Sequence, residues 1–149
     1  MKQLTALLLL LAASIGCAIA KPTIVARDAW SRPAIATGVV YVSLANHARV
    51  ADRLLGADSP VARAVELHES TETKGSGMAM NGMAMGSITS MHPVAFIRLP
   101  ARRTVRLAPG GYHIMLIGLK HELRAGQSFP LVLRFAHADT ITVAVHVMR

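Results

Sequence analysis

Two residues of the sequence, His113 and Met115, have the types and the spacing that could bind a soft metal ion. Because successive side chains of a strand point to opposite faces, these two would lie together on one face. Thioether sulfur is a soft ligand, and among biological metals it selects Cu(I). His68 and Met91 lie in two further segments with strand-like sequence. Folding could therefore join all four in a Cu(I) site of two histidines and two methionines.

The single cysteine, Cys17, limits the other metal chemistries that this chain could support. One thiol allows neither an internal disulfide nor a CxxC site. A blue-copper centre would need that thiolate in the folded domain. Zinc prefers His, Cys and carboxylate ligands, so Met91 and Met115 argue against it.

The N-terminal segment has the features of an export signal. Lys2 is followed by an apolar run over residues 4–15, and Ala18-Ile19-Ala20 forms a cleavage site of the A-x-A type. We expect residues 1–20 to be a cleaved signal peptide and residues 21–149 to be one exported domain without cysteine. The alternative is a lipoprotein that is anchored through Cys17. No later stretch approaches the roughly 20 apolar residues of a membrane span, so no stable membrane insertion is expected.

The elements that must position these side chains are short and rich in Val, Ile, Leu and Thr, with Pro and Gly between them. Sustained helical periodicity is absent from the sequence, which predicts an all-β fold, a β-sandwich of seven or more strands. Alternation is clearest at Val65-Glu66-Leu67-His68, where Glu66 and His68 share a face. The predicted strands cover residues 24–30, 38–44, 64–68, 88–99, 112–119, 129–135 and 141–147.

A segment rich in methionine and glycine, at about residues 74–86, interrupts this pattern. Its glycine content predicts a flexible loop inserted in the domain. Two interpretations remain open: a low-complexity insertion without function, or a second and weaker Cu(I) or Ag(I) site. The thioethers of that second site would be Met78, Met80, Met83 and Met85.

The motifs around these residues resemble the PCuAC family of periplasmic copper chaperones. Met91 is followed by 21 residues and then by His-x-Met at His113 and Met115, within the segment PGGYHIMLIGL. The resemblance implies a cupredoxin-like or Ig-like β-sandwich in the periplasm. It also implies Cu(I) bound by His68, Met91, His113 and Met115, and delivered to the copper-site assembly proteins of cytochrome c oxidase or to its apo subunit. We expect a monomer, with a metal-bridged dimer as the alternative.

The spacing between His68 and Met91 departs from the family pattern. The family usually has about ten residues there, whereas this chain has 22. The loop insertion accounts for the excess, and it brings Met80 and Met85 into competition for the position of Met91. Glu66 or Glu69 is the candidate for orienting His68.

Functions of other classes fit the sequence less well. The net charge of +8 favours a basic module that binds partners at the cell envelope, and Arg98, Arg102, Arg103 and Arg106 are the local concentration of charge. A copper-scavenging or tolerance protein without a specific acceptor is a further alternative. We expect no enzyme, because the G-x-S-x-G and H-E-x-x-H motifs are absent from the sequence, and no nucleic-acid binding.

Overall fold

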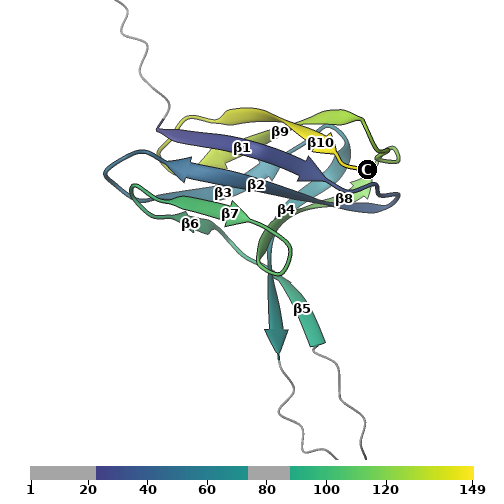
Figure 1. The fold of residues 1–149 in the computed structure, drawn as a ribbon, viewed down its shortest axis with the longest axis horizontal. Helices are drawn as coiled ribbons and strands as arrows, with labels where there is room; N and C mark the ends of the chain where they lie inside the picture. Colours follow the sequence, from purple (N-terminus) through teal and green to yellow (C-terminus); the bar gives the residue numbers. More distant parts are fainter. Residues whose placement is uncertain (1–22, 74–87) are drawn as a thin grey trace, which may run out of the picture.

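The computed structural model describes residues 23–73 and 88–149, and every regular element in this part of the chain is a β-strand (Figure 1). The predicted signal peptide and the predicted loop lie outside the described residues, so both remain predictions. The strands are β1 (Ile24–Ser31), β2 (Thr37–Asn46), β3 (Asp52–Asp58), β4 (Ala62–Thr73), β5 (Ile88–Pro93), β6 (Ile97–Leu99), β7 (Thr104–Leu107), β8 (Tyr112–Leu119), β9 (Ser128–Phe135) and β10 (Ile141–Val147).

The strands form one hydrogen-bonded sheet that curls around a single core. Its order is β5-β4-β8-β2-β1-β10-β9-β3-β6, and β7 pairs with the second half of β2 beside β8. The pair β1–β10 is parallel, and the other pairs are antiparallel. Figure 1 shows β4 and β5 continuing beyond the body as a two-stranded arm. The predicted all-β, cupredoxin-like sandwich is confirmed.

The core is built from the inward side chains of strands that alternate as the sequence predicts. From Gly38 to Asn46, β2 alternates strictly between buried and partly buried positions, and Leu44 lies at 0% exposure. In β8, Ile114 and Leu116 are fully buried among the aliphatic side chains of the sheet. Burial of each such side chain contributes about 1.5–3 kcal/mol. Burial of Ile114 and Leu116 determines which face of β8 points into the core. His113 and Met115 alternate with them and therefore point to the other face.

The structure differs from the prediction at β3, at β7 and within residues 88–99, and β4 is longer than the predicted range 64–68. The segment 88–99 forms two strands because β5 pairs with β4 whereas β6 pairs with β3, so the chain leaves one ladder to enter the other. β3 was not predicted because Asp52, Gly56 and Asp58 are depleted in strands; pairing with β9 and β6 on either side stabilises it. β7 was not predicted either, since it has only four residues, two of them polar.

Within the described residues, no helix has the length and apolar character that a membrane span requires.

Candidate metal centre

The strand registers place all four predicted ligands on the same face of the sheet. His68 of β4 lies directly opposite His113 of β8. Met115 is two residues beyond His113 and therefore shares its face. Met91 of β5 lies opposite Ser70, which is two residues beyond His68. Directly opposed residues point to the same face, so β5, β4 and β8 together present two imidazoles and two thioethers.

One ring nitrogen of His68 is held by a carboxylate, and the other has no partner. Nε2 lies 2.9 Å from Oε2 of Glu66, and a carboxylate at this distance accepts the Nε2 proton. The side chain of Glu66 is 47% exposed, whereas that of His68 is 11% exposed. Nδ1 is buried without any hydrogen-bond partner among the described residues. This contact therefore favours the tautomer of His68 that has a free lone pair on Nδ1.

His113 has the complementary arrangement. Its Nδ1 lies 3.1 Å from the carbonyl oxygen of Gly111, to which an Nδ1 proton is donated. Its Nε2 is buried and lacks a hydrogen-bond partner in the described part of the chain. The residue is only 2% exposed, and the centroids of the two imidazole rings are 5.7 Å apart. Two lone pairs are thus buried close together.

Those two buried nitrogens are expensive in a folded protein unless something binds them. A buried polar atom without a partner costs about 1–3 kcal/mol. Each orphaned nitrogen belongs to a ring whose opposite nitrogen is occupied, as in metal-binding histidines that are oriented through the other ring nitrogen. The donor set therefore fits a metal that accepts neutral imidazole.

A tight turn before β8 provides the carbonyl that orients His113. The amide of Gly111 donates to the carbonyl of Ala108 at 3.1 Å, and Gly110 has a φ of 85°. Pro109 followed by a glycine with positive φ is typical of a type II turn. The carbonyl of Gly111 accepts a second hydrogen bond, from the Ser70 amide at 3.1 Å. The PGGYH segment thus ties β4 and His113 together.

The thioethers lie at the accessible side of this face. Met91 is 57% exposed on the arm, whereas Met115 is half-buried on β8. Met78, Met80, Met83 and Met85 lie outside the described residues, so the second site that they would form remains a prediction, as does the competition of Met80 or Met85 with Met91.

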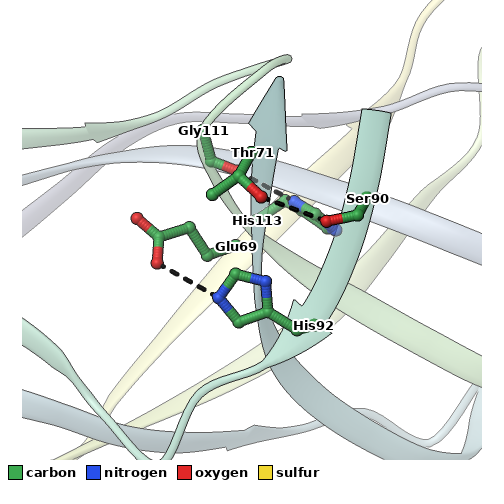
Figure 2. A network of polar contacts seen from close by, with 6 residues as sticks. All are labelled: Glu69, Thr71, Ser90, His92, Gly111 and His113. Carbon is green, nitrogen blue, oxygen red and sulfur yellow. Dashed lines mark hydrogen bonds and ion pairs between the residues drawn. The ribbon is translucent and has the colours of Figure 1, made fainter. Parts of the chain in front are cut away.

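The opposite face of the arm has a separate polar network, which Figure 2 shows together with the contact between His113 and Gly111. Nε2 of His92 lies 3.5 Å from Oε2 of Glu69, and Thr71 is hydrogen-bonded to Ser90 at 3.1 Å. Burial, with the charge and hydrogen bond of Glu69, raises the pKa of Tyr112 above its ordinary value of 10.0. Of the two carboxylates considered for His68, Glu66 makes the contact and Glu69 pairs with His92.

An aromatic pair next to the site, Tyr41 near His113 and Trp30 against Tyr41, was not predicted from the sequence. The centroids of Tyr41 and His113 are 6.5 Å apart, and those of Trp30 and Tyr41 are 4.6 Å apart. Trp30 reaches this position through a β-bulge in β1, where Asp28 has a φ of 53°. The extra residue turns Trp30 to the same face as Tyr41. A bulge leaves no periodic pattern in the sequence, so the position of Trp30 could not be predicted. The presence of a single tryptophan was the one signal that could have drawn attention to it.

Among the described residues, no group of three or more His, Cys, Asp and Glu side chains is placed to hold a metal ion. The one carboxylate that the described residues place in contact with the histidine pair is that of Glu66, which is hydrogen-bonded to Nε2 of His68.

Comparison with known proteins adds a family to this geometry. Residues 24–147 match the family model described as "LpqE-like: Putative lipoprotein LpqE-like". A relative from Leifsonia xyli subsp. xyli (strain CTCB07), described as "Putative lipoprotein Lxx21020", is 43% identical over 94 residues. That alignment covers 63% of this chain and 50% of the relative, so the chain spans about half the length of the curated relative that it matches.

Solved structures of PCuAC domains have the same fold. The Cu(I) form of DR1885 from Deinococcus radiodurans is 31% identical, with a TM-score of 0.62, and the match covers 92% of this chain and 85% of that one. The copper-bound PCuAC domain from PmoF2 is 23% identical with a TM-score of 0.66, covering 87% and 95%. The chain therefore belongs to the LpqE-like family, and its domain is of the PCuAC type.

Proposed function

We propose that this protein binds Cu(I) as a cargo and delivers it to the assembly of a copper enzyme, cytochrome c oxidase. The ligands in this proposal are Nδ1 of His68, Nε2 of His113 and the thioethers of Met91 and Met115. The observation that carries it is the pair of buried imidazole nitrogens without a partner, on the same sheet face as the two methionines. The similarity of this chain to DR1885, which has been solved with Cu(I), supports it.

The charge of the ligand set suits a monovalent soft ion. Two imidazoles and two thioethers are neutral, so binding does not depend on the deprotonation of a thiol. The carboxylate of Glu66, hydrogen-bonded to His68, then compensates the single positive charge of the ion. Zinc would gain little from thioethers, because it prefers thiolate, imidazole and carboxylate ligands.

The uneven burial of the ligands suits transfer rather than storage. The imidazoles are buried, and each is oriented by a hydrogen bond from its other ring nitrogen, to Glu66 or to the carbonyl of Gly111. Met91, in contrast, is exposed on the arm. An acceptor's ligand can therefore replace Met91 first while the histidines still hold the ion. The protein acts in this way as a binding and transfer protein, with no covalent chemistry of its own.

The proposed location is outside the cytoplasm. The description of the matching family as lipoproteins supports export. We propose the periplasm, reached through a cleaved signal peptide over residues 1–20, with lipid attachment at Cys17 as the alternative. Thioether ligands suit an oxidising compartment, where free thiols are lost to disulfides.

Anaerobic titration with Cu(I) against a chromophoric chelator tests the site. The wild-type chain is expected to compete for Cu(I), and a variant with His113→Ala and Met115→Ala is expected to lose this binding. The matched control carries His92→Ala and Met148→Ala, which removes the same residue types from outside the site. Tight stoichiometric binding that survives in the His113/Met115 variant would refute the assigned ligands.

Delivery is tested separately, by mixing the Cu(I)-loaded chain with the apo copper domain of an oxidase subunit. Transfer faster than from free chelated Cu(I) is expected for a chaperone. Transfer no faster than from the chelator would instead indicate a scavenging protein without a specific acceptor.

A further inference from the structure

A second surface of the domain, outside the copper site, concentrates positive charge. We name it the basic surface and define it by five arginines: Arg49, Arg53, Arg98, Arg102 and Arg103. All five are exposed. None of them forms an ion pair with the residues that the structure describes. Charges left unpaired in this way are available to a partner.

The backbone brings these arginines to one end of the molecule. Arg53 of β3 lies directly opposite Arg98 of β6, an unfavourable arrangement for two like charges. The amide of Arg102 donates to the carbonyl of Ala48 at 3.1 Å, which joins the turn after β6 to the loop that carries Arg49. Arg102 itself has a φ of 57°, a conformation that favours Gly or Asn over arginine. The positive charges of these arginines are therefore gathered at this end although their arrangement lowers local stability.

Buried polar residues fasten the loops at this end through hydrogen bonds. The side-chain amide of Asn46, 2% exposed, donates to the carbonyls of Val50 and Leu99 at 3.0 Å each. Within residues 47–53 and 96–103 the one acidic residue is Asp52. It is buried, and its carboxylate accepts hydrogen bonds from the backbone amides of Arg53, His137 and Ala138.

Exposed apolar side chains lie among the arginines. Phe96 is 44% exposed and Val50 is 66% exposed. The guanidinium of Arg53 lies 5.3 Å from the centroid of the Phe96 ring. Arginines mixed with aromatic and aliphatic side chains are typical of surfaces that bind the interface of an anionic membrane.

The N-terminal segment joins the domain at the same end. The amide of His47 donates to the carbonyl of Thr23 at 2.7 Å, so the start of β1 lies beside the loop that carries Arg49 and Val50. Cys17 precedes Thr23 by six residues, which span at most about 20 Å. A membrane attachment of that segment would therefore hold the basic surface close to the lipid headgroups.

We propose that the basic surface docks the domain on an anionic phospholipid membrane, with Phe96 and Val50 entering the headgroup region. The copper site remains accessible in this arrangement. It lies next to Val39, seven residues along β2 from Asn46, which is about 23 Å at the rise of a strand. The basic surface, which would contact the membrane, is therefore distinct from the surface used for copper transfer.

Sedimentation of the full chain with vesicles tests this proposal, using phosphatidylcholine with or without phosphatidylglycerol. Any insertion of the N-terminal segment would increase binding to both vesicle types. The readout is therefore the ratio of the partition coefficient for vesicles with phosphatidylglycerol to that for vesicles without it. The test variant carries Arg53→Gln, Arg98→Gln and Arg103→Gln. The matched control, which removes the same charge elsewhere, carries Arg63→Gln, Arg124→Gln and Arg149→Gln.

We expect the ratio to fall roughly fivefold for each arginine removed from the basic surface, and so about 100-fold in the triple variant. The control should change less than about fivefold, and the wild-type preference should weaken as salt is raised. Phe96→Ser should reduce binding by an amount that persists at high salt. Cu(I) binding should be unchanged in all these variants, so this proposal and the proposed function fail independently.

Three results would overturn the proposal. One is an equal fall for the two triple variants, which would assign the effect to net charge. Another is an unchanged ratio in the test variant. The third is arginine-dependent retention on immobilised polyglutamate without any preference for anionic vesicles, which would assign the surface to an acidic protein partner.

Discussion

The contact between Glu66 and His68 offers a quantitative test of how the site is tuned. Oε2 of Glu66 lies 2.9 Å from Nε2 of His68, so an ion on Nδ1 would be about 6 Å from the carboxylate charge. The carboxylate is half-exposed, and an effective dielectric constant of about 40–80 then gives about 0.7–1.4 kcal/mol of attraction. Loss of the hydrogen bond removes a further 1–1.5 kcal/mol, approximately.

The two substitutions of Glu66 should therefore differ in a fixed order. Glu66→Gln keeps an acceptor for the Nε2 proton but removes the charge, and should weaken Cu(I) binding about fivefold. Glu66→Ala removes both, and should weaken it roughly 50-fold, within the range known for residues that orient metal-binding histidines. Competition with a chromophoric Cu(I) chelator under anaerobic conditions measures both ratios.

Glu69→Gln is the matched control for this series. It removes the same charge from the same strand, but Glu69 contacts His92 on the opposite face. We expect less than about a twofold change, because a more distant exposed charge is screened by solvent and salt. The reasoning is refuted if Glu66→Ala binds as tightly as the wild type, or if Glu69→Gln loses as much affinity as Glu66→Gln.

Three further predictions concern stability and the loop. Partial burial raises the pKa of Asp52, but hydrogen bonds from the Arg53, Ala138 and His137 amides outweigh it, and the net pKa lies below the ordinary value of 3.8. Its stabilising contribution is therefore present above that value and is lost as the pH falls through the lower folded value. Asp52→Asn should lower the free energy of unfolding, measured in urea, by about 2 kcal/mol at neutral pH. The loss relative to the wild type should be smaller near pH 3. A loss of the same size at both pH values would contradict this prediction. Gly110→Ala places a side chain at a φ of 85° and should cost about 1 kcal/mol in the same assay, whereas an unchanged midpoint would contradict the turn assignment. Deletion of residues 75–86 should leave one tightly bound Cu(I), with sulfur and nitrogen ligands by X-ray absorption, and loss of all tight binding would show that the loop supplies a required ligand.

Local pattern was sufficient to predict most of the sheet. The ranges 112–119 and 141–147 agree with β8 and β10 residue for residue, because β10 alternates between the core and the outer face and β8 is a mostly apolar run that follows the Pro-Gly-Gly turn. β3 and the break between β5 and β6 could not be predicted in this way. They exist because of which strands lie beside them, and a single sequence does not contain that information.

The candidate site divides in the same manner. Strand alternation alone places His113 and Met115 on one face of their strand. It likewise places Glu66 and His68 together on one face of the strand that carries them. Alternation cannot show that His68 lies opposite His113, since that depends on the pairing of β4 with β8. It also cannot reveal the Gly111 carbonyl or the approach of Tyr41, both of which come from neighbouring strands and turns.

By itself, then, the sequence determined the fold class, the absence of any thiol beyond Cys17 and the residue types available to a soft metal. Composition and period-two alternation are local properties, and they are sufficient for these conclusions. Only the tertiary structure decided that the two imidazoles share a buried face with their free nitrogens unpaired, and that five dispersed arginines form one surface beside Thr23. Both results depend on strand register and loop contacts between residues that are distant in the chain, and folding alone brings such residues together.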